Sequence, residues 1–317
     1  MSVDLSVSLC GVPLRNPVIA ASGTFGYGTE YASLMDVGAL GGICSKGLTL
    51  EPRSGNRGVR LAESPSGLIN SIGLENPGIR SFIENQLPTM LALGPAVLAN
   101  LSGSTLETYV EGAKLLDATG AQMIELNISC PNVSDGGMIW GVDCASAASI
   151  TAAVRAATKK PLAVKLSPNA PDLVGVARAV VGAGADALSL VNTFTAFAVD
   201  VERGVPVFEN KTAGLCGPAI RPIALRMLRD IMLNVPECSL DRARGKASGR
   251  FVPVIGLGGI ATWRDAAEFI MTGATAIQVG AATFANPKAM PEIIAGLEAF
   301  MARKGYGNLD AMRGIAL

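Results

Sequence analysis

Eight short apolar runs divide this chain of 317 residues, and their spacing limits the architectures open to it. The runs are rich in Val, Ile, Leu and Ala and show little alternation, which is typical of parallel strands covered on both faces. Helical patterns separate them, so the order of elements is strand, helix, strand throughout. We expect strands at residues 17–21, 42–45, 96–101, 122–128, 162–166, 187–191, 252–257 and 276–279.

Helix signals fill most of the gaps between these runs. Ser104 with Glu107, and Thr262 with Asp265, have the spacing of capping boxes that would open two of the helices. Further helices are expected at 145–157, 172–183, 220–233 and 290–303. Eight such units predict an α/β fold, a single (β/α)8 TIM barrel over residues 1–317. The alternative is a doubly wound open sheet, which would leave eight strands without an obvious division into halves.

Three segments are too long or too irregular for simple connections. Residues 46–78 and 192–217 follow expected strands, so they should form long active-site loops at the C-terminal face of the barrel. Residues 236–250 precede a strand and should lie at the opposite face. We interpret them as a surface insertion, with contact to a partner as the weaker alternative.

Composition excludes several classes of function. The chain has no histidine, so His-based proton transfer, Ser–His or Cys–His nucleophiles and His-ligated metals are excluded. The 26 basic and 26 acidic side chains balance, so the net charge does not indicate binding to nucleic acid or to an anionic membrane. No apolar run approaches about 18 residues, so no membrane span is expected. None of the six cysteines forms a CxxC pair, and we expect no metal site and a cytoplasmic protein.

Polar side chains follow six of the eight expected strands. They include two lysines, Lys46 and Lys165, and several amides such as Asn100, Asn127 and Asn192. The carboxyl ends of barrel strands meet at one mouth, so these groups should converge there. The set suits a planar, polar, anionic ligand with many N–H and C=O groups.

Glycines end the last two strands and predict a phosphate site. Gly258, Gly259, Gly280 and Ala281 would leave backbone N–H groups open to an anion, at the place where barrels commonly bind phosphate. Gly256, Gly258 and Ala261 also match a dinucleotide fingerprint, but no acidic residue follows at the end of the next strand. We therefore reject direct NAD binding at this point.

Cys130 is the best candidate for a base. It lies three residues after Asn127, at the start of a loop that continues to a Gly-Gly pair. A thiol has a pKa of about 8.5 and can serve near neutral pH if a nearby cation lowers that value. Lys165 could supply charge beside a bound cofactor.

Five motifs together resemble dihydroorotate dehydrogenase. They are NPVIAASG at 16–23, NSIGL at 70–74, NISCPN at 127–132, GLCGPAI at 214–220 and IGLGGI at 255–260. The resemblance covers nearly the whole chain. It implies an FMN-containing barrel that oxidises (S)-dihydroorotate to orotate, the redox step of pyrimidine synthesis.

The resemblance also points to a class. Cys at the base position is typical of class 1 enzymes, and the loop 132–138 looks like class 1B. Members of that class form a homodimer that associates with a subunit carrying FAD and a [2Fe-2S] cluster, a heterotetramer that passes electrons to NAD+. Two enzyme alternatives remain, a class 1A-like enzyme that uses fumarate and a Schiff-base aldolase barrel using Lys46 or Lys165. A non-catalytic flavin-binding or scaffold subunit is a third.

By position, the resemblance implies roles for individual residues. Cys130 would remove the C5 proton while hydride leaves C6 for flavin N5. The substrate would be held by Lys46, Asn70, Ser71, Ile72, Gly73, Leu74, Asn127, Asn132, Asn192 and Thr193. FMN would be held by Ser22, Lys46, Gly47, Asn100, Asn127, Lys165, Val191, Gly217, Gly258, Gly259, Gly280 and Ala281.

Two positions depart from the family pattern. Ala281 stands where Thr is usual, so a hydroxyl contact to the phosphate is lost and only the N–H remains. Cys216 stands where Ser is common, beside the flavin glycine.

Overall fold

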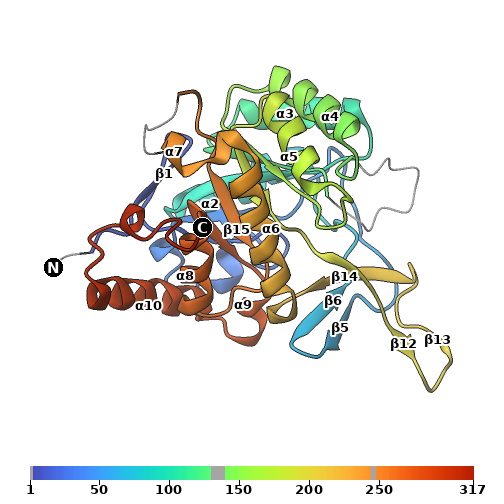
Figure 1. Cartoon of the computed structure of the whole chain (residues 1–317). Helices are drawn as coiled ribbons and strands as arrows, with labels where there is room; N and C mark the ends of the chain where they lie inside the picture. Colours follow the sequence, from blue (N-terminus) through green and yellow to red (C-terminus); the bar gives the residue numbers. More distant parts are fainter. Residues whose placement is uncertain (1–2, 130–139, 244–247) are drawn as a thin grey trace.

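A closed barrel of eight parallel strands forms the centre of the computed structural model (Figure 1), which describes residues 3–129, 140–243 and 248–317. All eight expected strands are present, with ends that differ from expectation by two residues at most. The (β/α)8 barrel prediction is therefore confirmed. In chain order the strands are β3 (Val18–Ala20), β4 (Gly42–Cys44), β7 (Ala96–Leu101), β8 (Met123–Asn127), β9 (Leu162–Lys165), β10 (Ala187–Leu190), β15 (Val254–Leu257) and β16 (Ala276–Val279).

Helices cover the outside of the barrel, as the apolar strand composition requires. Nearly every barrel-strand residue is buried, because one face meets the barrel interior and the other meets a helix. Among the described residues, no helix is long and apolar enough to cross a membrane. The outer helices are α1 (Ile79–Ser81), α2 (Leu87–Ala92), α3 (Leu106–Asp117), α4 (Cys144–Ala157), α5 (Leu173–Gly182), α6 (Arg221–Asn234), α8 (Trp263–Met271) and α10 (Ala289–Lys304).

One of the two expected capping boxes is confirmed and the other was misplaced. The Thr262 hydroxyl accepts from the Asp265 N–H at the start of α8, and the Asp265 carboxylate accepts from the Thr262 N–H. For α3 the cap is Thr105, and its partner is Thr108, whose hydroxyl accepts from the Thr105 N–H. Two adjacent hydroxyl residues and a Glu offered competing registers, and local sequence could not separate them.

The two segments expected as long loops contain strands instead. Residues 46–78 and 192–217 supply an antiparallel sheet in the order β11-β14-β6-β5. A small apolar cluster of Ile69, Phe208 and Ala213 lies beneath it. The strands are β5 (Leu61–Ser64), β6 (Gly67–Asn70), β11 (Phe194–Phe197) and β14 (Thr212–Cys216).

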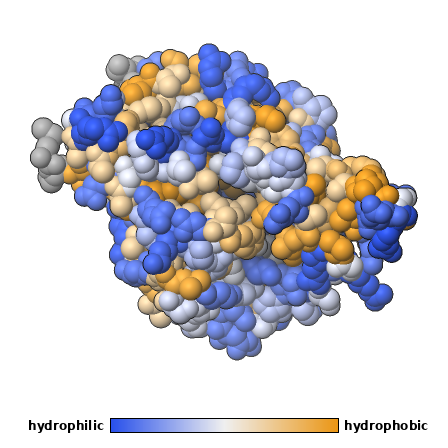
Figure 2. All heavy atoms as spheres, turned by 90° about the horizontal axis from the view of Figure 1, so that it is seen from below, coloured by the Kyte–Doolittle hydropathy of each residue, from blue (hydrophilic) through white to orange (hydrophobic). Residues whose placement is uncertain are grey.

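This sheet lies beside the barrel and carries a projecting hairpin. The hairpin consists of β12 (Val199–Asp200) and β13 (Val205–Pro206), and it points away from the barrel (Figure 1). Apolar side chains gather on this projecting part of the surface (Figure 2), among them Leu61, Phe197 and Val201.

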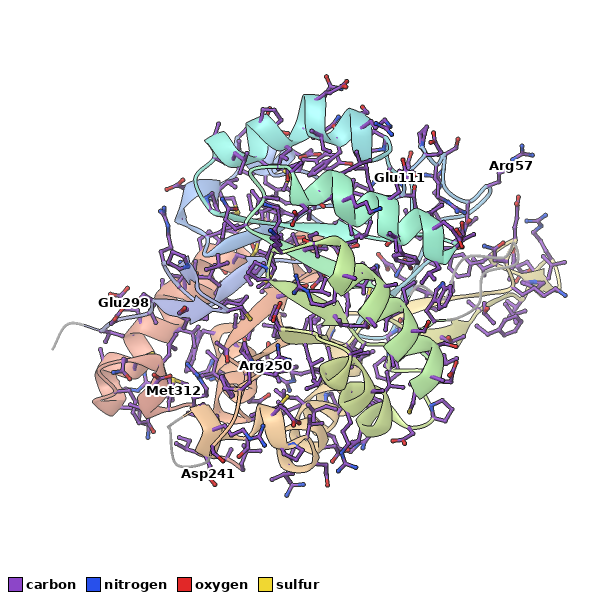
Figure 3. All side chains as sticks on the ribbon, turned by 90° about the horizontal axis from the view of Figure 1, so that it is seen from above. Arg57, Glu111, Asp241, Arg250, Glu298 and Met312 are labelled. Atoms are coloured by element: carbon purple, nitrogen blue, oxygen red, sulfur yellow. The ribbon has the colours of Figure 1, made fainter. Side chains whose placement is uncertain are left out.

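The opposite end of the barrel is closed by the N-terminus and by part of the insertion. The first strands, β1 (Val7–Leu9) and β2 (Val12–Leu14), form an antiparallel hairpin, and Cys10 in its turn donates to the Asp186 carbonyl just before β10. Arg250, at the end of the insertion, pairs with the Asp186 carboxylate at 3.0 Å. Figure 3 places Arg250 and Asp241 well away from Arg57, which belongs to the 46–78 segment. The described insertion residues therefore lie at the expected face.

Candidate active site

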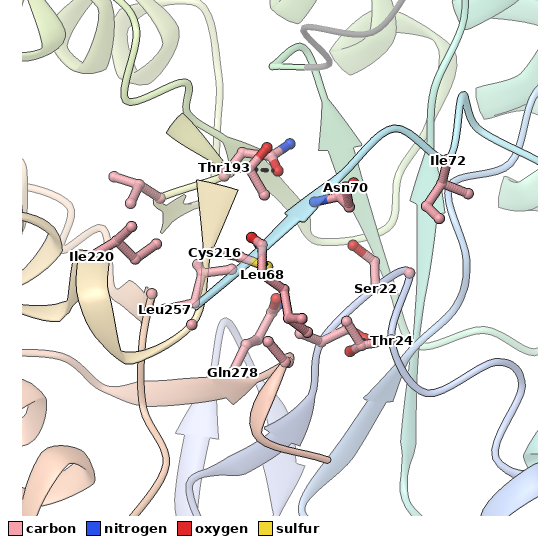
Figure 4. A pocket seen from close by; sticks show the side chains of 18 of the residues that line it. Ser22, Thr24, Leu68, Asn70, Ile72, Thr193, Cys216, Ile220, Leu257 and Gln278 are labelled. Carbon is pink, nitrogen blue, oxygen red and sulfur yellow. Dashed lines mark hydrogen bonds between the residues drawn. The ribbon is translucent and has the colours of Figure 1, made fainter. Parts of the chain in front are cut away.

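One cavity opens at the C-terminal ends of the barrel strands, between the barrel and the antiparallel sheet. It encloses about 1370 Å³ of space, part of it open to solvent. Labelled side chains from the first barrel strand's loop, β6, the loop after β10 and β16 face this space together (Figure 4). Seventeen of the residues predicted from the sequence line it: Ser22, Lys46, Gly47, Asn70, Ile72, Gly73, Leu74, Asn127, Lys165, Val191, Asn192, Thr193, Gly217, Gly258, Gly259, Gly280 and Ala281.

A buried ion pair supports the cavity. Lys165 Nζ lies 3.6 Å from Glu125 Oε1, and the two side chains are only 4% and 0% exposed. Lys165 Nζ also donates to the Ser22 hydroxyl at 3.1 Å. Burial alone would raise the pKa of the Glu125 carboxyl. The Lys165 charge and hydrogen bonds from Gln278, Cys44 and Asn100 outweigh burial and hold that pKa below its usual value. The cavity wall thus carries a fixed cation, Lys165, which is held from behind by the buried, ionised carboxylate of Glu125.

Amide side chains form a continuous chain of hydrogen bonds along the cavity wall. Asn127 Nδ2 donates to Asn100 Oδ1 at 3.3 Å. Asn127 Oδ1 accepts from the Ser129 hydroxyl at 2.9 Å, and Asn192 Nδ2 donates to the same hydroxyl at 2.8 Å. Each partner fixes the orientation of the next, so the amides present defined donors and acceptors to a ligand.

The antiparallel sheet and its flanking loop supply the outer wall. Asn70 Nδ2 donates to the Gly214 carbonyl at 2.9 Å, which ties β6 to β14. Lys46 is 25% exposed and lies 4.0 Å from Glu75, which is held more closely by Arg60 at 2.9 Å. Lys46 is therefore a loosely held cation available to a negatively charged ligand, unlike Lys165.

Glycine backbone forms one end of the cavity. Gly258 and Gly259 have φ values of 124° and 77°, which other residues rarely adopt. A side chain at Gly259 would clash with the Gly217 carbonyl, 2.8 Å from the position of a Cβ. In the described part of the chain, the backbone N–H groups of Gly259, Gly280 and Ala281 donate to no protein acceptor. Such a cradle fits an anion such as a phosphate group.

Two described site predictions, Ser71 and Asn100, are not among the residues that line the cavity. Ser71 is buried beside it, and its hydroxyl accepts from Asn56 at 2.9 Å, so its side chain does not face a ligand. Asn100 lies one step behind the wall, where it bonds Glu125 and Asn127. Cys130 and Asn132 lie outside the described residues.

Other lining residues escaped the sequence analysis. Gln278 lies in the middle of an apolar strand and had no local signal beyond being the one polar residue in β16. Glu125 does not line the cavity but supports it from β8, where it had a comparable signal as a carboxylate among mostly apolar residues. Leu61, Leu68 and Phe284 add apolar surface, and nothing in their neighbourhoods distinguishes them from other exposed apolar residues.

The described thiols near the cavity are poor bases. Burial raises the pKa of Cys216, which lines the cavity, and raises that of Cys44 in the barrel interior well above its ordinary value. The five described cysteines are all free thiols. No group of three or more Cys, Asp or Glu residues in the described ranges could hold a metal ion.

Comparison with known proteins identifies the family. The sequence profile described as dihydroorotate dehydrogenase matches residues 4–301. This chain belongs to the dihydroorotate dehydrogenase family. It is thus an oxidoreductase, as the motifs had predicted.

Curated relatives resemble this chain over nearly its whole length. A protein of Petrotoga mobilis is 48% identical over 99% of both chains. Proteins of Caldicellulosiruptor saccharolyticus and Trichlorobacter lovleyi are 46% and 47% identical over at least 98% of this chain and 99% of each relative. All three carry the name dihydroorotate dehydrogenase B (NAD(+)), catalytic subunit.

The two lysines that line the cavity, Lys46 and Lys165, should differ sharply in their effect on folding. Lys165→Met would leave Glu125 charged and buried without its cation, and we expect a loss of about 3–5 kcal/mol in the free energy of unfolding. Lys46→Met removes only an exposed, distant pair, so the change should stay within about 1 kcal/mol. Urea unfolding of both variants without added ligand measures the difference. Equal losses would contradict the assignment of the buried pair.

Proposed function

We propose that this chain is the catalytic subunit of an NAD+-linked dihydroorotate dehydrogenase, which oxidises (S)-dihydroorotate to orotate with FMN as its cofactor. The main support is one cavity that combines a cation backed by Glu125, a chain of oriented amides and a glycine end with free N–H groups. Those features match a planar heterocycle that carries a phosphate.

The residues present fit FMN. The N–H groups of Gly259, Gly280 and Ala281 would hold the phosphate, although Ala281 offers no hydroxyl. Lys165 would face the ring and favour negative charge on it. When bound, FMN supplies a hydride acceptor for C6 of the substrate. The remaining FMN contacts would come from Ser22, Lys46, Gly47, Asn100, Asn127, Val191, Gly217 and Gly258.

The amides and Lys46 would bind and orient dihydroorotate. Lys46 is the partly exposed cation of the cavity and would attract the substrate carboxylate. Asn127 and Asn192 are fixed through Ser129, so their free donors and acceptors can match the imide edge of the ring. The remaining substrate contacts would come from Asn70, Ile72, Gly73, Leu74, Asn132 and Thr193. The Ser71 hydroxyl is bonded to Asn56, so any contact from Ser71 would come from its backbone.

Cys130 would remove the proton from C5 of the substrate. It follows Ser129 directly, and Ser129 is buried in the amide chain at the cavity wall. The high pKa of Cys216 and Cys44 leaves these thiols protonated near neutral pH, so neither competes for the role.

Electrons would leave through a partner subunit. The relatives' names contain both "NAD(+)" and "catalytic subunit", and this chain lacks CxxC pairs and a usable dinucleotide fingerprint. We therefore propose a homodimer joined to a subunit with FAD and a [2Fe-2S] cluster. The alternative is an enzyme that passes its electrons to fumarate. A comparison of electron acceptors, described below, distinguishes the two.

Bound flavin is the first test of this proposal. Purified protein should be yellow and should release one FMN per chain on denaturation. Borohydride with substrate should trap no adduct at Lys46 or Lys165, because neither lysine forms a Schiff base in this proposal. A colourless protein that FMN cannot reconstitute would refute the proposal, and a lysine adduct would favour the aldolase alternative.

Replacement of Cys130 tests the base. Cys130→Ser should lower turnover by about 10²–10⁴-fold while FMN stays bound, because a hydroxyl is a far weaker base than a thiolate. The wild-type rate should rise with pH as the thiol ionises, and the variant should need a higher pH. Stopped-flow reduction of FMN by dihydroorotate measures both. Cys144→Ser, at an exposed position outside the cavity, is the matched control.

Acceptor preference tests the partner. The chain alone should pass electrons to artificial dyes but reduce NAD+ slowly, and addition of the co-expressed partner should raise NAD+ reduction strongly. Steady-state rates with dye, fumarate and NAD+ give the comparison. Efficient reduction of NAD+ or of fumarate by the isolated chain would count against the class 1B assignment.

A further inference from the structure

Gln278 has a buried oxygen atom without a hydrogen-bond partner in the part of the chain that the structure describes. Its side chain lines the cavity from β16, and the residue is 1% exposed. Nε2 donates to Glu125 Oε2 at 2.7 Å, whereas Oε1 is buried and has no hydrogen bond in the structure. A buried carbonyl oxygen without a donor is unfavourable, so a molecule that fills the cavity gains by supplying one.

Glu125 determines which end of the Gln278 amide faces the cavity. An ionised carboxylate only accepts hydrogen bonds, so it can face the NH₂ group of Gln278 and not its oxygen. Three further groups keep Glu125 charged and in place. Asn100 Nδ2 donates at 2.7 Å, Cys44 Sγ donates at 3.2 Å, and Lys165 Nζ lies 3.6 Å away. The Gln278 oxygen must therefore point away from Glu125.

The same carboxylate fixes a donor beside this acceptor. Lys165 and Gln278 both line the cavity and both contact Glu125, one through each carboxylate oxygen. The cavity therefore presents a cationic N–H donor and a carbonyl acceptor that are held together. An imide edge, in which an N–H lies between two carbonyl oxygens, has the complementary pattern.

We propose that Gln278 accepts a hydrogen bond from the imide N–H of the flavin ring, and that Glu125 is a positioning residue that orients Gln278 and Lys165 for it. This inference rests on the proposed FMN binding. Oxidised isoalloxazine carries only this one ring N–H, at N3. Two neighbouring amide oxygens are already engaged, because that of Asn100 accepts from Asn127 and that of Asn127 accepts from Ser129. Gln278 thus selects a ring that carries an imide donor.

An analogue of the cofactor tests the contact without any mutation. Apoprotein is titrated with FMN and with 3-methyl-FMN, which lacks the N3 hydrogen, and flavin fluorescence reports binding. Wild type should bind FMN at least about tenfold more tightly, the worth of one hydrogen bond made in a buried site. Gln278→Leu should bind FMN about tenfold more weakly than wild type and should discriminate little between the two flavins.

A matched variant separates this effect from the general loss of an amide. Gln86 also has a buried oxygen without a partner, but it lies in the helical turn Phe82–Gln86 and does not line the cavity. Gln86→Leu should keep the wild-type affinity and discrimination. Full discrimination by Gln278→Leu, or none by wild type, would overturn the inference. A wild type that binds no flavin would instead overturn the proposed function.

The flavin midpoint potential tests the role of Glu125. Glu125→Gln keeps the shape but removes the negative charge that opposes Lys165, so the bound flavin should become easier to reduce and its potential should rise. It should also lose discrimination against 3-methyl-FMN, because either end of the Gln278 amide can then face residue 125. Glu125→Asp retains the charge and should keep the potential near that of wild type. An unchanged potential and unchanged discrimination in Glu125→Gln would refute the positioning role.

Discussion

The geometry of the cavity depends on the contacts that the Glu125 carboxylate makes in the barrel interior. A charge removed from water is unfavourable unless other groups replace its hydration. Here Lys165, Asn100, Gln278 and Cys44 do so from four other strands. Replacing both members of a buried ion pair such as Lys165 and Glu125 by apolar groups often costs little stability, so the main consequence of the pair is geometric. One carboxylate determines where the cation and the amide groups stand.

The barrel supplies only part of the cavity, and the antiparallel sheet supplies the rest. Asn70 and Cys216 come from β6 and β14, and the bond from Asn70 to the Gly214 carbonyl joins the two strands. The sheet is stabilised by its own small apolar cluster, separate from the main core. Residues far apart in sequence thereby form one wall, and the projecting hairpin extends from that wall (Figure 1).

Sequence reasoning worked best where a physical signal is local. Buried parallel strands must be continuous apolar runs, so all eight were found, and glycines at the ends of β15 and β16 indicated the cavity end. It failed for β11 to β14, because strands of two to five residues carry little local signal and depend on pairing. The sheet is completed only by a distant partner, since β14 pairs with β6 and places Cys216 opposite Leu68. Ser71 is not among the residues that line the cavity, and a related reason kept this out of reach of the sequence. The local sequence does not reveal that the side chain of Asn56 donates a hydrogen bond to the Ser71 hydroxyl.

The sequence by itself determined the barrel, the family, the absence of imidazole chemistry and most of the residues that reach the mouth. These follow from composition, from the period of apolar residues and from motifs, which are properties of neighbouring positions. Only the tertiary structure decided that Lys165 is a buried, paired cation while Lys46 is loosely held. It also decided that Gln278 lines the cavity and that its buried oxygen has no hydrogen-bond partner among the described residues. Those properties depend on groups brought together across the barrel, since burial and hydrogen-bond partners are set by packing and not by chain order.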